Sequence, residues 1–468
     1  MTYHTKAMPE TPLADALSSL SRKVGSSFHT LPLSGGRSLN QSLFKARYEE
    51  LFGKNCLDSE MTVSGSHFDS FFFGEKVIHE AEQLAAKLFG ADGTLFVTTG
   101  TTVSNQIALD ALHEQGMRTL MDKNCHQSLH FGLHGKNAEV EYLQPSWSCG
   151  QSHKKAWSLG DLLAMTLEAQ ASGRPYDLII LNAHSYDGVV YDIPCVIGYL
   201  LKQGVTTQSF LIDEAWGAAN YFHQDLQPLT AMNVGSLVEA HPGLRVVATH
   251  SAHKSLSCLR QASMIHHRGP GELSERLKLS RFRLHTTSPS YPILASLDLA
   301  RAQMQQEGEV LMARASELAA RFREEVRDCL SNTGIGLNEA SVASSPIPYA
   351  HADPTKVSIN VSELGMSASE IRDILFSKHG IYVNRITEAS LLFNFHIGID
   401  ASSVDQLLQA LRDISAKTRQ WPSLNCSEKF IIPYPPGVPL VVPGEPITEA
   451  IQKQIRDIQR AGVYVFYA

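Results

Sequence analysis

The sequence predicts an α/β fold with a large, mostly parallel-sheet domain and a smaller C-terminal α/β domain. Short apolar segments typical of strands alternate with segments of helical periodicity from about residue 77 to residue 270. Polar residues directly follow several of these apolar segments, at the strand ends where α/β proteins bind ligands. The pattern changes after Pro292, where a second set of strands and helices begins.

The large domain begins with a helix over residues 77–88, which Gly90 ends. A strand over 94–97 leads into a helix over 103–112. Further strands are expected at 119–121, 140–143, 177–181, 209–212, 244–248 and 262–266, with helices such as 158–171 between several of them. Because strands that alternate with helices usually run parallel, these segments predict a mostly parallel sheet covered on both faces.

The C-terminal part begins with helical residues 294–330, either one long helix or two helices broken at Gly308. Strands are expected at 357–361 and 391–397, and a helix at 402–416. Ser367 and Glu370 form a capping box that opens another helix. The predicted organisation is an N-terminal arm over 1–60, a large domain over 61–300 and a small domain over 301–468 that includes the linking helix.

Charge and composition exclude several classes of partner. The formal net charge is −7 without a long basic run, so neither nucleic acid nor an anionic membrane is expected as a partner. The N-terminus lacks the apolar stretch of a signal peptide, and no window approaches the apolar length of a membrane span. Seven cysteines lie dispersed without a C-x-x-C pair, which predicts reduced thiols and a cytoplasmic location, and no metal site is expected.

Lys254 is the candidate nucleophile. It follows His253 directly, shortly after the apolar run 244–248. A free lysine is protonated at neutral pH, but burial and nearby cations lower its pKa and free the amine. Such a lysine can hold the aldehyde of pyridoxal phosphate as a Schiff base. A lone lysine in a loop is usually a surface residue, so the prediction depends on the residues around it.

Asp213 supplies the matching charge, because it ends the apolar run 210–212. Pyridoxal phosphate accepts electrons only while its pyridine nitrogen is protonated, and a carboxylate at that nitrogen keeps the proton there. An aspartate after a strand is equally typical of a helix N-cap, so Asp213 alone leaves both interpretations open.

Two further strand ends complete the candidate site. Gly100, Thr101 and Thr102 stand at a strand-to-helix junction, where backbone N–H groups and hydroxyls can hold a phosphate; Ser251 can add another hydroxyl. His126 follows the strand at 119–121, and its ring could stack on the pyridine. Each signal is weak alone, because Ser and Thr cap many helices and most histidines are structural.

Taken together, these residues resemble a known family. From about residue 65 to the C-terminus the chain is similar to the bacterial ornithine/lysine/arginine decarboxylases, which are fold-type-I enzymes that depend on pyridoxal phosphate. The segments that match are TGTTVSNQ at 99–106, DKNCHQS at 122–128, DEAW at 213–216, SAHK at 251–254, QASMIH at 261–266, HTTSPSYP at 285–292, DPTK at 353–356 and YPPGVPLVVPGE at 434–445. So many segments in the same order make chance agreement very improbable.

The resemblance implies roles for matching residues. Lys254 would carry the cofactor, Asp213 would pair with the pyridine nitrogen, His126 would stack on the ring and Ala215 would pack against its other face. The phosphate would be bound by the hydroxyl and imidazole groups of Thr101, Thr102, Ser251 and His253. In this family the loop around Thr287 and Ser288 crosses a dimer interface, so one of these residues would reach the phosphate in the other subunit of a homodimer.

The chain departs from the family pattern at three points. It is too short for the N-terminal wing domain of the large members, which favours a dimer or a dimer of dimers. Thr99 stands where the family usually has Asn. Arg260 stands where a small residue is common, and could contact a phosphate or a carboxylate or lie at the surface.

The expected function is α-decarboxylation of arginine, lysine, ornithine or a modified relative to the amine and CO2, with Lys254, His126 and Asp213 as catalytic residues. The alternatives are aminotransfer or oxidative deamination by the same cofactor, which control of protons and oxygen access would select. A non-enzymatic regulatory role is disfavoured, because Lys254, Asp213 and His126 are all present.

Overall fold

The computed structural model describes residues 7–61, 68–148, 155–338, 349–387, 389–420, 427–434, 437–445, 447, 449–460 and 462–468. By their contacts the residues divide into two compact units. The first unit covers residues 1–320, 339–356 and 394–399, and the second covers 321–338, 357–393 and 400–468. The predicted domain boundaries at residues 60 and 300 stay predictions.

The centre of the first unit is a seven-stranded sheet with the order β1-β10-β9-β8-β6-β2-β3, counted within the described residues. The strands from β9 to β3 run parallel, while β10 is antiparallel to both of its neighbours. The predicted mostly parallel sheet is therefore confirmed, with its strands at β1 (Gly93–Val97), β2 (Arg118–Asp122), β3 (Glu139–Leu143), β6 (Leu178–Asn182), β8 (Ser209–Asp213), β9 (Arg245–His250) and β10 (Ser263–Arg268).

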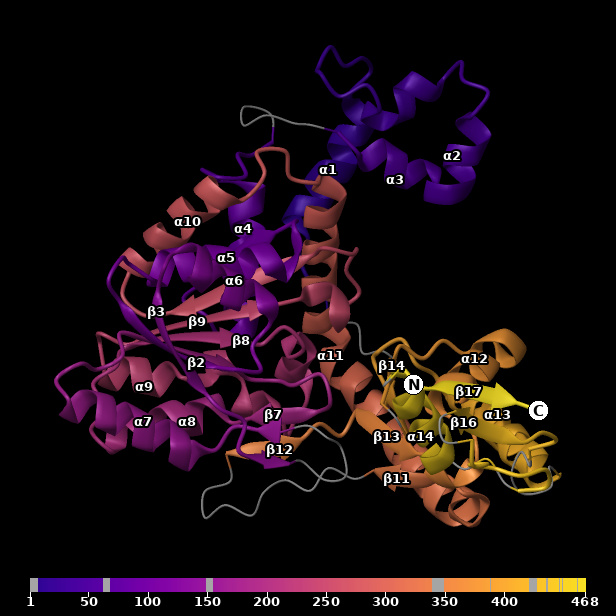
Figure 1. Cartoon of the computed structure of the whole chain (residues 1–468). Helices are drawn as coiled ribbons and strands as arrows, with labels where there is room; N and C mark the ends of the chain where they lie inside the picture. Colours follow the sequence, from indigo (N-terminus) through magenta and orange to yellow (C-terminus); the bar gives the residue numbers. More distant parts are fainter. Residues whose placement is uncertain are drawn as a thin grey trace. The chain divides into compact units, whose positions relative to one another are not determined.

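Alternation along the strands sends apolar side chains to both faces of this sheet. Ile180 packs with helices α5 (Gly100–Leu112), α6 (Gln127–Gly135) and α10 (Glu272–Leu284). Its neighbour Ile179 packs on the opposite face with α7 (Leu159–Ala171) and α8 (Ile193–Lys202). Figure 1 shows these two groups of helices on the two sides of the sheet. The short helix α9 (Gly235–Ala240) precedes β9.

The N-terminal region contains α1 (Pro12–Lys23), α2 (Lys45–Phe52) and α3 (Lys54–Ser59). Leu13 and Leu17 of α1 are buried in a core that includes residues of α4 (Val77–Phe89) and α11 (Tyr291–Glu325). Asp298 fixes the start of α1, because its Oδ2 accepts hydrogen bonds from the backbone N–H groups of Leu13 at 3.0 Å and Ala14 at 3.2 Å.

A small sheet brings a distant part of the chain to the first unit. Strand β7 (Val189–Tyr191) pairs antiparallel with β12 (Ala350–Ala352). Directly after β12, the backbone N–H of Asp353 donates to the Gly188 carbonyl at 2.8 Å. This pairing places residues 353–356 beside the loops that follow the large sheet.

The second unit has its own sheet, with the order β11-β13-β15-β14, and a separate two-stranded sheet of β16 and β17. Its strands are β11 (Gly336–Asn338), β13 (Lys356–Asn360), β14 (Arg385–Ile386), β15 (Ser390–Asn394), β16 (Ile431–Tyr434) and β17 (Tyr464–Tyr467). Its helices are α12 (Ala368–His379), α13 (Ala401–Gln420) and α14 (Glu449–Arg460). The predicted capping box of Ser367 and Glu370 is confirmed at the start of α12.

The segment predicted at 294–330 as one long helix or two helices has the first of these forms. Helix α11 runs unbroken through Gly308, and a π-helical turn over Val326–Leu330 follows it. Gly308 serves packing instead of a break, because a Cβ there would lie 2.7 Å from the Phe222 ring. The strand expected at 391–397 ends at Asn394, after which the Phe395 N–H donates to the Thr355 carbonyl at 2.8 Å.

Within the described residues, no helix combines the length and apolarity that crossing a membrane requires.

Candidate active site

The polar residues singled out in the sequence gather at one edge of the large sheet. Strands β1, β2, β8 and β9 point the same way, so their carboxyl ends lie at the same edge. Asp213 is the last residue of β8, and Lys254 lies in the short helix Ala252–Lys254 just after β9. His126 caps the N-terminus of α6 after β2, and Gly100 opens α5 after β1.

Asp213 is buried, and its carboxylate makes three long hydrogen bonds. Its Oδ2 accepts from the backbone N–H of His126 at 3.4 Å and from the Asn105 amide at 3.5 Å. Its Oδ1 accepts from the Ala215 N–H at 3.3 Å. Because charge-assisted bonds to a carboxylate are normally shorter than 3 Å, these contacts leave Asp213 able to accept a stronger bond from a protonated ring nitrogen.

Asn105 is a site residue to which the sequence assigned no role. Its amide also donates to the Ser128 hydroxyl at 3.0 Å, and its carbonyl oxygen accepts from the Thr249 hydroxyl at 2.6 Å. Asn105 thus ties together α5, α6, β8 and β9 around Asp213. The sequence signal was its place in the segment 99–106, five residues after Gly100, but no periodicity indicated where its amide would point.

Lys254 lies against an aromatic ring. Its Nζ is 4.4 Å from the centroid of the Trp216 ring, within the range of a cation–π contact. Burial lowers the pKa of Lys254, the Asp213 carboxylate opposes this shift, and Lys356 acts in the same direction as burial. The lowered pKa is what a lysine needs to react as a free amine near neutral pH.

The ring of His126 is held at one end. Its Nδ1 contacts the Ser128 hydroxyl at 2.9 Å and accepts from the Ser128 N–H at 3.3 Å. The side chain is exposed in the single chain. Ala215 is buried two residues after Asp213.

The candidate phosphate loop is built from three segments. Gly100 has φ of +79°, which favours glycine, and a Cβ there would meet nothing within 4 Å. The Gly100 N–H donates to the Gln261 carbonyl at 2.9 Å, and the Thr101 and Ser263 hydroxyls are 3.1 Å apart. His253 Nδ1 lies 2.9 Å from the Ala262 carbonyl, so the loop that carries Lys254 is fixed to the same segment.

Open space and spare donors make this loop suitable for an anion. The Thr99 hydroxyl is buried, and so is that of Ser255, which follows Lys254. Neither has a hydrogen-bond partner within the described part of the chain. Thr102 is exposed on the first turn of α5, and Ser251 is buried directly after β9. Backbone N–H groups at this helix N-terminus add positive potential, so the set fits the phosphate of pyridoxal phosphate.

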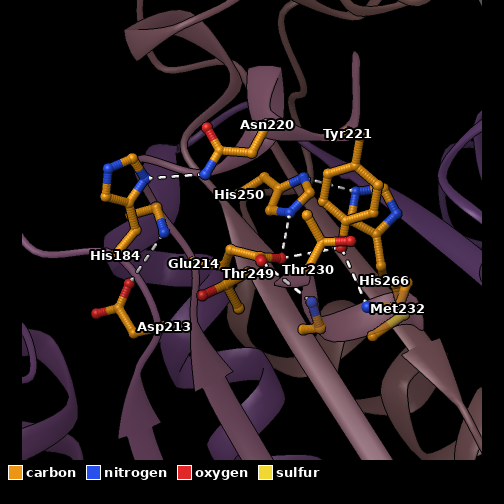
Figure 2. A network of polar contacts seen from close by, with 12 residues as sticks. His184, Asp213, Glu214, Asn220, Tyr221, Thr230, Met232, Thr249, His250 and His266 are labelled. Carbon is orange, nitrogen blue, oxygen red and sulfur yellow. Dashed lines mark hydrogen bonds and ion pairs between the residues drawn. The ribbon is translucent and has the colours of Figure 1, made fainter. Parts of the chain in front are cut away.

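Glu214 points away from Asp213 into a buried network, which Figure 2 shows. Its Oε2 accepts from the Tyr221 hydroxyl at 2.9 Å and lies 2.9 Å from His250 Nε2. His250 Nδ1 in turn lies 3.0 Å from His266 Nε2. Burial lowers the pKa of His266 well below its ordinary value, which keeps that ring neutral. The network holds His250, the last residue of β9, and so holds the start of the loop that carries Lys254.

Three predicted residues have exposed side chains in the single chain. Thr287 and Ser288 are exposed in the loop between α10 and α11, while His285 at its start accepts a hydrogen bond from the Thr98 N–H at 3.0 Å. The loop is therefore fixed at its base while its tip faces outward. Arg260 is also exposed, and its suggested contact with a phosphate or carboxylate stays a prediction.

A family model described as "Orn/Lys/Arg decarboxylase, major domain" matches residues 11–403. The chain belongs to this family. The lysine decarboxylase of Hafnia alvei is 28% identical over 435 residues, which are 85% of this chain and 57% of that protein. The constitutive lysine decarboxylase of Escherichia coli K12 is 29% identical over 446 residues, 86% of this chain and 60% of that protein. The chain thus spans less than two thirds of both relatives.

A shorter relative is matched over nearly its whole length. The arginine decarboxylase of Bacillus subtilis is 26% identical over 478 residues, which are 94% of this chain and 92% of that protein. Among solved structures, the lysine decarboxylase of Francisella novicida matches with a TM-score of 0.75 at 20% identity, over 96% of this chain and 76% of that one. These matches confirm the predicted family and the predicted α/β fold class, the fold-type-I architecture.

Proposed function

We propose that this chain is a pyridoxal-phosphate-dependent α-decarboxylase of a basic amino acid, namely arginine, lysine, ornithine or a modified relative. The reaction removes the α-carboxylate as CO2, takes up one proton at the α-carbon and leaves the amine. The observation that carries the proposal is the convergence of Lys254 and Asp213 at the carboxyl edge of the sheet, in a chain of this family. The matched lysine and arginine decarboxylases support the basic substrate.

The cofactor, when bound, would supply an aldehyde for the substrate amine and a protonated ring that accepts the electron pair left by CO2. Lys254 would hold that aldehyde between turnovers, and its lowered pKa supports this role. Asp213 would keep the proton on the ring nitrogen, for which its long hydrogen bonds leave capacity. His126 and Ala215 would hold the two faces of the ring.

The phosphate would be bound by the loop after β1 together with residues around Lys254. We assign Gly100, Thr101, Thr102, Ser251 and His253 to this binding. Lys254 or a nearby histidine would also return the proton to the α-carbon. The buried contacts of His250 with Glu214 and His266 would hold the end of β9, and with it Lys254, in place during this step.

The assembly proposed is a homodimer with shared active sites, in which Thr287 or Ser288 reaches the phosphate in the other subunit. The exposed tip of the 285–290 loop supports this geometry. The distal cation of the substrate would be recognised by the C-terminal part or by the partner subunit. A cytoplasmic location stays a prediction of the sequence.

The test is a product assay with purified protein and added pyridoxal phosphate. Arginine, lysine and ornithine are supplied in turn, in air and under nitrogen, and amine and CO2 are measured by mass. We expect one amine per CO2 from one of these substrates, equally with and without oxygen. Lys254→Ala should lower turnover by about 10³-fold or more, because it removes the group that carries the cofactor.

Products of another kind would overturn the proposal. A keto acid with transfer of the amino group would indicate an aminotransferase, and oxygen-dependent ammonia or peroxide would indicate oxidative deamination. Undiminished turnover by Lys254→Ala would contradict the role of that residue whatever the product.

A further inference from the structure

A second lysine lies close to Lys254. The Nζ of Lys254 is 4.4 Å, and that of Lys356 is 4.7 Å, from the centroid of the same Trp216 ring. The two Nζ atoms are therefore no more than about 9 Å apart. Both lysines line one pocket together with Asn220, Thr355 and His396, all of them in the first unit.

Lys356 is fixed in this position by its own neighbours. Strand β12 pairs with β7, and Asp353 then binds the Gly188 carbonyl through its backbone N–H. A Cβ at Gly188 would lie 3.1 Å from the Lys356 Cβ, so only glycine allows the two segments to approach this closely. Lys356 itself is buried.

Asp353 keeps a negative charge beside Lys356. Its Oδ2 lies 3.0 Å from Nε2 of the buried His184, and its Oδ1 accepts from the Thr355 hydroxyl at 2.6 Å. Burial alone would raise the pKa of Asp353, but His184, Lys356 and Thr355 together hold it below its ordinary value. Burial lowers the pKa of Lys356, and the Asp353 carboxylate opposes that shift.

The proposed cofactor site contains a conflict that Lys356 can resolve. Asp213 must be ionised to hold a proton on the ring nitrogen, but its charge also stabilises the ammonium form of Lys254, which cannot react. A second cation close to Lys254 offsets the attraction of Asp213, since like charges in a partly buried site repel. The groups that act on Lys254 besides burial are Asp213 from β8 and Lys356 from the start of β13.

We propose that Lys356 is a positioning residue whose positive charge offsets the attraction of Asp213 and so keeps the Lys254 amine free of its proton. The inference rests on the proposed function, because it assumes that Lys254 is the reactive amine. Lys356 acts through Lys254. Of the other titratable groups in the pocket, Asp353 is paired with His184, and His396 Nδ1 accepts from the Gly398 N–H at 3.1 Å.

The test measures the proton affinity of Lys254 in the cofactor-free protein. The protein is labelled with a trace of acetic anhydride from pH 6 to 11, and the labelled fraction of the Lys254 peptide is read by mass. In Lys356→Met the midpoint of labelling should rise by about one pH unit. Lys356→Arg keeps the charge and should leave the midpoint where it is in the natural protein. Lys202→Met, an exposed change at the end of α8, is the matched control for loss of a lysine.

A second neutral variant covers the case in which Lys356→Met does not fold. Lys356→Gln also removes the positive charge, so it should raise the labelling midpoint of Lys254 in the same way. Equal midpoints in Lys356→Met and the natural protein would overturn the inference. An equal rise in Lys356→Arg would also overturn it, because the effect would then follow side-chain shape and not charge.

The outcomes separate this inference from the proposed function. If pyridoxal phosphate reacts with Lys254 but the midpoint does not depend on Lys356, only the inference fails. If the cofactor attaches elsewhere or not at all, the proposed function fails with it.

Discussion

Asp122 lies beside the site, and its side-chain carboxyl group is buried. Burial disfavours the ionised form of this carboxyl group. Burial raises its pKa to about 7, backbone N–H groups at Asn124 and Asn182 oppose this shift, and the Asp213 carboxylate adds to it. Its Oδ1 accepts from the Asn124 N–H at 2.9 Å. Its Oδ2 is buried without a partner in the described part of the chain. We infer that Asp122 is largely protonated below neutral pH.

This protonation predicts a pH-dependent stability. An unfolded aspartate ionises near pH 4, so from about pH 4 to 7 the folded protein holds one more proton than the unfolded chain. Asp122 therefore lowers the free energy of unfolding by about 1.4 kcal/mol per pH unit as the pH rises through this window, and the effect levels off above it. The Asp122→Asn variant lacks this titrating carboxyl group and serves as the reference.

The measurement is urea unfolding of both proteins between pH 5 and 7.5. The stability of the natural protein relative to Asp122→Asn should fall as the pH rises towards 7, while titrations common to both cancel. A difference that stays constant over this range would show that Asp122 is ionised throughout.

At the scale of single residues, the sequence predicted which side chains carry the chemistry but not which atoms they contact. Lys254, Asp213 and His126 were predicted from their places after strands, and the structure brings all three to one edge of the sheet. Asn105 and Lys356 were visible in recognised segments but received no role. Their importance depends on which atoms they approach, Asp213 Oδ2 and the Trp216 ring, and neither periodicity nor spacing specifies such approaches.

Among the elements, the strands of the large sheet were predictable because each is a short apolar run between polar segments. The helix α4 was predictable to its end, where Gly90 adopts φ of +69° as a helix-terminating glycine does. For helix α11 the sequence left open whether Gly308 breaks the helix, and the structure shows one helix with the Phe222 ring packed against Gly308. Local sequence does not reveal such a long-range neighbour.

The pairing of β7 with β12 was also beyond the sequence. More than 150 residues separate Val190 from its partner His351, and each strand has only three residues. Strands this short carry little periodicity. Yet this pairing places Asp353 and Lys356 beside Trp216, so an element that the sequence did not predict positions a charge of the candidate site.

For the whole molecule, the proposed homodimer predicts that exposed apolar side chains of the N-terminal region are covered in the assembly. Phe28, Leu43 and Leu51 expose 102%, 98% and 75% of their surface in the single chain. Isolated exposed apolar residues are ordinary, but several large ones in one region are typical of an interface. Together with the outward loop at Thr287 and Ser288, they support the proposed homodimer.

Sedimentation equilibrium should give a particle of two chains or of a multiple of two. The double change Leu43→Asp and Leu51→Asp should shift the equilibrium towards single chains, because each would place a charge in an apolar contact. It should also lower activity at dilute protein, since each site would lose its neighbouring subunit. The double change Leu43→Asn and Leu51→Asn, which adds no charge, is the milder comparison. A natural protein that sediments as one chain and is fully active would contradict the shared site.

The central claim is that Lys254 holds the cofactor while Asp213 holds the ring nitrogen. The most direct measurement is reduction of the purified protein with borohydride after addition of pyridoxal phosphate, followed by peptide mapping by mass. We predict one cofactor per chain, attached to Lys254, and no such adduct in Lys254→Ala. Attachment to Lys356 or to another lysine, or no attachment at all, would contradict this account.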